Sequence, residues 1–263
     1  STNWAHERRT LIRDGTLCII GDRHMATVST GEAIVRLLAA YNVDTVFGIP
    51  GVHTLEFYRG FGEGSSVRHV QARNELGAGF MADGYARSSG RPGVCLTISG
   101  PGVTNAATAV GQAYADSLPL LLISAEAHSE TLGKGRGTLH EVSDLNAVTR
   151  PMTAFSECVK SVEEIPQLIA KAFDIFASER PRPVHISIPI DILNSTIEEN
   201  WQPVQLSEKP QPDALISKDI AARLIGAENA YIMVGGGAVG ADIKTLAERA
   251  GAIVIASNAG KGR

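Results

Sequence analysis

The sequence predicts an α/β protein in which a parallel β-sheet is flanked by helices, followed by part of a second α/β unit. Short runs rich in Val, Ile and Leu alternate along the chain with segments of helical periodicity. The runs at residues 93–99 and 118–125 are continuously apolar, which is typical of parallel strands buried on both faces. Together these two observations favour a sheet that helices cover on both sides.

The predicted elements follow one another in a regular order. Ser29-Thr30-Gly31-Glu32 has the spacing of a capping box, so the first helix is expected at residues 29–42. Further helices are expected to begin near residues 75, 104 and 166. Residues 126–144 are polar and contain glycines, which predicts a long loop over a functional site. Strands are expected at residues 44–49, 66–71, 93–99, 118–125, 153–159 and 183–188.

The helix that begins at Glu75 carries an unusual number of glycines. Glu75, Gly79 and Ala82 recur at helical spacing and share one face, which is almost bare of side chains. Each interior glycine costs roughly 1 kcal/mol relative to alanine. We therefore expect Gly77, Gly79 and Gly84 to lie where another backbone or a ligand comes very close. A tightly packed internal helix with a surface glutamate at its N-terminus is the alternative.

The flanking segments are organised differently. Residues 1–26 are expected to be a disordered leader or tag, with the folded unit starting near Met25, because the apolar patch at 17–20 is too short for a signal peptide. Residues 195–215 are polar and contain three prolines, which predicts a linker. Residues 216–263 read as helix, strand, glycine-rich turn, helix and strand. They predict an incomplete Rossmann-like unit.

Composition narrows the possible partners. Hydrophobic residues make up 44% of the 263 residues and charged residues 20%, as in globular proteins. The net charge of −4 provides no basic field for phosphates, so neither nucleic acid nor a membrane is an expected partner. Cys18, Cys95 and Cys158 show no paired spacing, which favours a reducing compartment, the cytoplasm.

Single motifs in the sequence indicate two different kinds of site. Gly235-x-Gly237-x-x-Gly240 follows a predicted strand, as in dinucleotide-binding oxidoreductases, but the acidic residue expected about 20 positions later is missing. A tight turn between strand and helix is the alternative there. His53 and His140 lie in loops that follow predicted strands, where parallel sheets place their sites.

Several ordered motifs between residues 27 and 194 carry a more specific resemblance. They resemble the pyrimidine-binding domain of thiamine diphosphate enzymes of the acetolactate synthase and 2-oxo acid decarboxylase family, and residues 216–263 resemble the start of that family's central domain. The motifs are Arg73-Asn74-Glu75, the run Met-Ala-Asp-Gly-Tyr-Ala-Arg at 81–87, Gly100-Pro101-Gly102-x-x-Asn105, Ala115-Asp116-Ser117-x-Pro119, and the Pro-rich strand at 181–191.

The resemblance implies a chemistry for Glu75. In such enzymes the equivalent glutamate hydrogen-bonds a ring nitrogen of the cofactor's aminopyrimidine and favours an imino tautomer, which removes the thiazolium proton. The resulting ylide attacks the ketone of a 2-oxo acid. After decarboxylation, an enamine is either protonated to an aldehyde or added to a second carbonyl. The protein mainly orients and desolvates the cofactor.

The resemblance also implies a set of site residues. The catalytic residues are expected to be Glu75, His53 and His140, with the two histidines near the reacting carbonyl. Acetolactate synthases usually carry Phe-Gln-Glu where this chain has Leu139-His140-Glu141, and a glycine pair where it has Gly51-Val52-His53. Both departures favour decarboxylases of 5-guanidino-2-oxopentanoate, the transaminated form of arginine. The expected cofactor-binding residues are Pro50, Gly51, Glu75, Gly100, Pro101, Gly102, Asn105 and Glu141.

The family binds Mg²⁺ and the diphosphate through a Gly-Asp-Gly motif in a C-terminal domain, and no such motif occurs in this sequence. No metal ligand is therefore expected among these residues. The cofactor lies between two subunits in the family, which implies a homodimer or homotetramer. Two alternatives to a decarboxylase or carboligase remain, namely a catalytically incomplete fragment and a dinucleotide-binding oxidoreductase.

Overall fold

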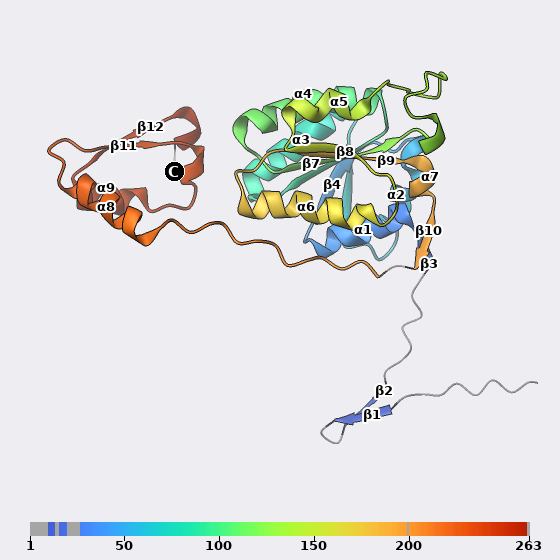
Figure 1. Ribbon diagram of the computed structural model, residues 1–263, viewed down its shortest axis with the longest axis horizontal. Coiled ribbons are helices and arrows are strands. Elements are labelled where there is room, and N and C mark those ends of the chain that lie inside the picture. The colour runs from blue at the N-terminus through green and yellow to red at the C-terminus, as the bar shows by residue number, and fades with distance from the viewer. Residues whose placement is uncertain (1–9, 14–15, 20–26, 199, 262–263) are drawn as a thin grey trace, which may run out of the picture.

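A six-stranded parallel sheet forms the centre of the computed structural model (Figure 1), which describes residues 10–13, 16–19, 27–198 and 200–261. The strand order is β5-β4-β6-β7-β9-β8, and every neighbouring pair is parallel. This confirms the predicted fold class. The strands are β4 (Thr45–Gly48), β5 (Arg68–Gln71), β6 (Gly93–Thr97), β7 (Leu120–Glu126), β8 (Phe155–Cys158) and β9 (Val184–Pro189).

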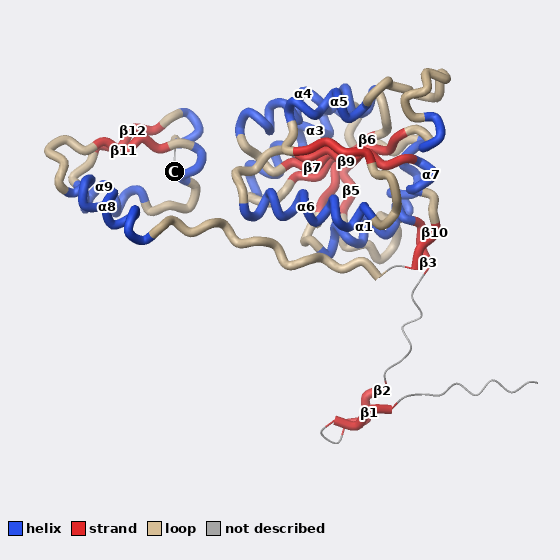
Figure 2. Tube along the Cα trace, viewed as in Figure 1, coloured by secondary structure: helices blue, strands red, loops and turns tan. Residues whose placement is uncertain are grey.

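Helices cover both faces of this sheet, as Figures 1 and 2 show. One face carries α3 (Glu75–Ser89), α4 (Pro101–Asp116) and α5 (Leu145–Thr149), and the other carries α1 (Thr30–Ala40) and α6 (Glu164–Ser178). Leu120 and Leu122 belong to the core on the first side, whereas Leu121 and Ile123 belong to the core on the second. Successive side chains of a strand point to opposite faces, so a continuously apolar strand supplies both cores.

The helix boundaries follow from local capping. Ser29 caps α1 by accepting a hydrogen bond from the Glu32 amide at 3.3 Å. Asn74 caps α3 by accepting one from the Leu76 amide at 2.8 Å, and α3 ends at Gly90 with φ of 70°. Side-chain acceptors at such positions satisfy amides that have no partner within the helix. Shorter elements, namely α2 (Leu55–Arg59), α7 (Ile190–Leu193) and turns η1 (Val52–Thr54), η2 (Ser129–Thr131) and η3 (Arg150–Met152), connect the larger ones.

The two ends of the first unit pair with each other. Strand β3 (Thr27–Ser29) pairs antiparallel with β10 (Thr196–Glu198), which lies at the start of the segment expected to be a linker. Residues 201–213 contain no helix or strand. This stretch still contacts the first unit, because the Val204 amide donates to Tyr41 Oη at 3.1 Å and the Ser207 amide to Asp174 Oδ1 at 2.7 Å.

The C-terminal unit begins with α8 (Ala214–Ile225) and continues through β11 (Tyr231–Val234), turn η4 (Gly236–Ala238), α9 (Ile243–Ala250), β12 (Ile253–Ala256) and turn η5 (Asn258–Gly260). Strands β11 and β12 pair in parallel, as expected for the opening of a second α/β unit. Within the described ranges, no helix is long and apolar enough to cross a membrane.

The expected leader stays a prediction. Strands β1 (Thr10–Arg13) and β2 (Thr16–Ile19) form an antiparallel pair within it. The other residues of 1–26 lie outside the described residues.

The glycines of α3 differ in their surroundings. A Cβ at Gly79 would lie 2.7 Å from the Cβ of Ala109 on α4, so the close approach expected there is confirmed. A Cβ at Gly77 or Gly84 would meet no atom of the described chain within 4 Å, so the expectation that a ligand or a second chain approaches these two glycines stays a prediction.

This difference predicts opposite effects of alanine on stability. Gly79→Ala should lower the free energy of unfolding by about 1–3 kcal/mol, because the added methyl overpacks the contact between α3 and α4. Gly84→Ala should raise it by up to about 1 kcal/mol, because alanine favours an open helical position. Urea denaturation of both variants measures the difference, and equal effects would contradict this account of the packing.

Candidate functional site

The predicted site residues come from loops that follow four parallel strands. Glu75 follows β5, and Pro50, Gly51 and His53 follow β4. Gly100, Pro101 and Gly102 follow β6, whereas His140 and Glu141 lie in the long loop after β7. All four strands point the same way, so their carboxyl ends meet at one edge of the sheet. Parallel pairing therefore gathers residues that are far apart in the sequence.

Glu75 and Asn105 form the first group. Glu75 is the first residue of α3, and Asn105 lies in the second turn of α4. The Asn105 side-chain amide donates to Glu75 Oε2 at 3.0 Å. Within the described residues Glu75 Oε1 has no hydrogen-bond partner, so one oxygen is oriented and the other can accept from a ligand. Leu76 and Phe80, which are 41% and 42% exposed, add apolar surface to the same helix.

His53, Ser99 and His140 form the second group. His53 Nδ1 lies 3.0 Å from Ser99 Oγ. The His53 and His140 rings are nearly perpendicular, with centroids 6.0 Å apart. Burial, together with the neighbouring His140, lowers the pKa of His53 below its ordinary value. His53 is therefore neutral at pH 7, and its ring can both donate and accept a proton.

Gly100 allows the loop after β7 to approach this group. Gly100 has φ of 48°, and a Cβ there would lie 2.3 Å from the backbone oxygen of His140. His140 itself has φ of 62°, which is uncommon for a residue other than glycine. Gly51 and Gly102 are also tightly packed, since a Cβ at either would lie within 3 Å of the Ile98 side chain. Contacts within the chain are therefore sufficient to explain why Gly51, Gly100 and Gly102, three of the predicted cofactor-binding residues, lack a side chain.

Glu141 is bound by its own loop. Its carboxylate accepts hydrogen bonds from the amides of Arg136, Gly137 and Thr138 at 3.2, 2.5 and 3.1 Å. Desolvation opposes ionisation of Glu141, but these backbone donors outweigh it and lower the pKa of the carboxyl group. In this structure Glu141 makes no hydrogen bond to any other predicted site residue.

Two residues near the site were not predicted from the sequence. Ser99 is fully buried and contacts His53, a role that only the pairing of distant loops reveals. Glu126 ends β7 and is 5% exposed; its Oε1 accepts from the Ala127 amide at 2.9 Å. Burial raises the pKa of Glu126, and the nearby charge of Asp144 adds to the rise. An acidic residue at the end of a continuously apolar run is the signal that could have identified it.

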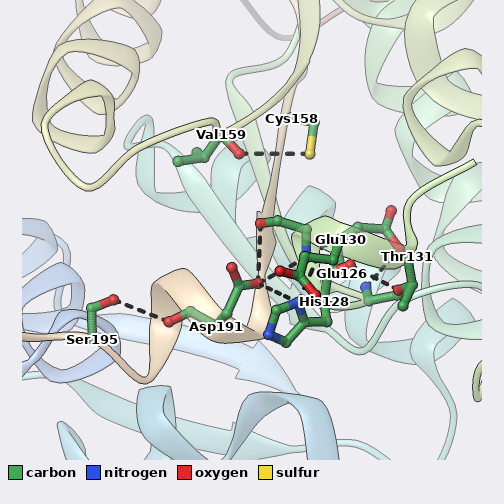
Figure 3. A network of polar contacts seen from close by, with 10 residues as sticks. Glu126, His128, Glu130, Thr131, Cys158, Val159, Asp191 and Ser195 are labelled. Atoms are coloured by element: carbon green, nitrogen blue, oxygen red, sulfur yellow. Dashed lines mark hydrogen bonds and ion pairs between the residues drawn. The ribbon is translucent and has the colours of Figure 1, made fainter.

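A polar network surrounds Glu126 at the ends of β7, β8 and β9 (Figure 3). Asp191 Oδ1 accepts from the Ser129 amide at 2.9 Å and from Ser129 Oγ at 3.1 Å, and it lies 3.9 Å from His128 Nδ1. This network fixes the first turn of the loop that later carries His140. Among the described residues, no group of three or more His, Cys, Asp or Glu side chains is arranged to hold a metal ion.

Comparison with known proteins identifies the family of one part of the chain. Residues 28–148 match the protein family described as thiamine pyrophosphate enzyme, N-terminal TPP binding domain. Residues 28–148 therefore belong to that family. The matched TPP-binding domain contains every predicted site residue from Pro50 to Glu141. This confirms the family resemblance identified from the motifs.

The relatives of this chain are longer enzymes. The chain is 55% identical over 241 residues to a probable 2-ketoarginine decarboxylase of Pseudomonas aeruginosa, covering 90% of this chain and 43% of that protein. It is 37% identical over 224 residues to the large subunit of acetolactate synthase isozyme 1 of Escherichia coli, covering 83% and 39%. The corresponding acetolactate synthase subunit of Corynebacterium glutamicum is also 37% identical, over 232 residues. The chain spans less than half the length of these relatives.

The glycine motif of the C-terminal unit lies outside the TPP-binding domain. Turn η4 separates β11 from α9, which begins only at Ile243. The glycine turn of a dinucleotide site leads directly into a helix N-terminus, which binds the pyrophosphate. After β12 the chain continues with Ser257, whose hydroxyl accepts from the Gly260 amide at 3.2 Å. The geometry here is that of a tight turn rather than a dinucleotide site.

The second group predicts a measurable interaction between its two imidazoles. His53 should titrate below its ordinary pKa, and His140→Gln should raise that pKa because it removes a neighbouring positive charge at low pH. NMR titration of labelled histidines measures both values. His128→Gln is the matched control, because His128 lies beside Asp191 and should leave His53 unchanged. An unaltered His53 pKa in His140→Gln would contradict the proximity of the two rings.

Proposed function

We propose that the complete protein is a thiamine diphosphate- and Mg²⁺-dependent enzyme that decarboxylates a 2-oxo acid, and that this chain supplies the pyrimidine-binding part of its site. The hydrogen bond between Asn105 and Glu75 carries the proposal, because it presents an oriented carboxylate within the TPP-binding domain. The ligands for Mg²⁺ and the diphosphate are assigned to a C-terminal domain outside this sequence.

The residues present fit a nitrogen heterocycle. Glu75 is half-buried and has one free oxygen that can accept a ring N–H, while Asn105 holds the other oxygen in place. Pro101 is exposed at the start of α4, and Pro50 is exposed after β4. We assign both prolines, with Gly51, Gly100 and Gly102, to the surface that contacts the cofactor. When bound, the cofactor supplies the carbon nucleophile and accepts the electrons released by loss of CO₂.

His53 and His140 are assigned to the reacting carbonyl. Neutral His53, held by Ser99, can donate a hydrogen bond to a carbonyl oxygen or move a proton at its free ring nitrogen. His140 is exposed beside it and can act on the same oxygen. Glu141 stays a candidate cofactor contact only through its loop, since its carboxylate is engaged by three backbone amides.

The substrate proposed is 5-guanidino-2-oxopentanoate or a similar 2-oxo acid. The relative named a probable 2-ketoarginine decarboxylase supports this choice, because it is similar over 90% of the chain. Condensation of 2-oxo acids is the second candidate, and the acetolactate synthase relatives favour it.

We also propose that the complete protein is a homodimer or homotetramer of the cytoplasm. The outer face of α3 combines the exposed Leu76 and Phe80 with Gly77 and Gly84, at which a side chain would meet no atom. A flat surface with exposed apolar side chains suits a second subunit. Cys95 and Cys158 are free thiols, as in a reducing compartment.

Removing the charge of Glu75 tests the proposed cofactor site. In the complete protein, Glu75→Gln should slow proton exchange at the reactive carbon of bound thiamine diphosphate at least about 10²-fold, because the activating carboxylate is lost. Exchange into D₂O is followed by NMR, and thermal unfolding serves as the control for folding. Exchange at the normal rate in a folded Glu75→Gln variant would refute the role of Glu75.

Product analysis separates the candidate activities. The complete protein, supplied with thiamine diphosphate, Mg²⁺ and 5-guanidino-2-oxopentanoate, should release CO₂ and the corresponding aldehyde. Pyruvate as substrate provides the comparison, since acetolactate formed from it would favour the condensing activity. Failure to bind thiamine diphosphate in calorimetry and to act on either substrate would support the interpretation of this chain as part of a catalytically inactive protein.

A further inference from the structure

The loop between β7 and α5 contains a compact glycine-rich segment, residues 133–141. Gly133, Gly135 and Gly137 have φ of 67°, 60° and 71°. We propose that Glu141 is a positioning residue: its carboxylate is an internal anion that closes this segment and thereby holds His140 against Gly100, beside His53. The consequence for catalysis rests on the proposed function, whereas the closure itself does not.

The backbone of the segment forms a concavity for an anion. The amides of Arg136, Gly137 and Thr138 converge on the two carboxylate oxygens of Glu141, Arg136 on Oε1 and the other two on Oε2. Consecutive amides that point to one side are a known way of binding negative charge. The Glu141 amide also donates to the Thr138 backbone oxygen at 3.0 Å, which closes the turn from the other direction. One side chain therefore satisfies three amides.

The charges around the segment suit an anion at this position. Lys134 and Arg136 are both exposed and flank the concavity, and neither forms an ion pair among the described residues. The nearest acidic side chain along the loop, Asp144, is engaged elsewhere, because it caps α5 through the Ala147 amide and lies 3.5 Å from Arg150. Glu141 therefore supplies the negative charge that the backbone amides of the glycine-rich segment bind.

The position of His140 depends on this closure. A residue other than glycine keeps a left-handed backbone only where its surroundings enforce it. His140 is restrained on one side by Gly100, whose lack of a side chain lets the His140 carbonyl approach. On the other side, the next residue is the clamped Glu141. Release of Glu141 leaves His140 free to return to a common backbone conformation, which moves its ring away from His53.

The two ends of the loop are fixed independently of Glu141. Ser129 is bound to Asp191 at the start of the loop. At its end, Thr149 of α5 contacts the buried His185 Nδ1 at 2.7 Å. The effect of Glu141 is therefore confined to residues 133–141, and a variant there should leave the sheet intact.

The experiment compares Glu141→Gln, Glu141→Asp and the control Glu130→Gln in the complete protein. Glu130 is exposed in the same loop. Hydrogen exchange of the Arg136, Gly137 and Thr138 amides should be roughly tenfold or more faster in Glu141→Gln, since hydrogen bonds to a charged acceptor are lost. Trypsin cleavage after Lys134 and Arg136 should accelerate by a similar factor, as it follows the population of the open loop. Glu130→Gln should match the wild type, and Glu141→Asp should lie between.

Unchanged exchange and cleavage in Glu141→Gln would overturn the closure. Neither measurement requires turnover, so this outcome is distinct from failure of the proposed function. In the cofactor-loaded enzyme, Glu141→Gln should lower kcat more than it raises KM, with partial rescue by Glu141→Asp. Faster cleavage with an unchanged kcat would leave the closure in place and refute the positioning of His140.

Discussion

The parallel pairing of β4, β6 and β7 is the constraint on which the site depends. Because these strands run in the same direction, His53, Ser99 and His140 reach one edge of the sheet from three separate loops. Helix α3 follows β5 and brings Glu75 to the same edge. Burial of β7 on both faces maintains this arrangement, since each of its seven residues is buried. The apolar strands thus determine where the polar groups meet.

The sheet also contains polar residues, and these connect it to α5. His185 is fully buried; its Nε2 lies 2.9 Å from Ser124 Oγ, and its Nδ1 lies 3.1 Å from Ser156 Oγ. Burial lowers the pKa of His185 to about 3, so the ring is neutral and needs hydrogen-bond partners rather than an opposite charge. Asn146 of α5 joins the network through Ser156 and Ser187 at 2.9 and 2.8 Å. A buried network with every member bonded gives α5 one defined position.

Much of the fold could be predicted from the sequence because its signals are local. Continuous apolar runs identified the strands, and side-chain caps such as Ser29 identified helix starts. Helices α2 and α5 were not predicted, because five residues are too few to show helical periodicity. The site was predicted in part. Motifs gave Glu75 and Asn105 but not their hydrogen bond, and the contact of Ser99 with His53 arises only because two distant loops meet.

The glycines of α3 show why the sequence pattern alone does not predict how this helix packs. Gly77, Gly79 and Gly84 look alike in the sequence, yet only Gly79 lies against α4. That contact sets the separation of α3 and α4, and hence the distance between Glu75 on one helix and Asn105 on the other. Gly93 extends the same packing to the sheet, because a Cβ there would collide with the backbone oxygen of Ala82. Close packing of the α3 backbone against α4 and the sheet therefore positions the Glu75 carboxylate. Gly77 and Gly84 lie on the opposite face of α3, which we assign to a neighbouring subunit in the proposed oligomer.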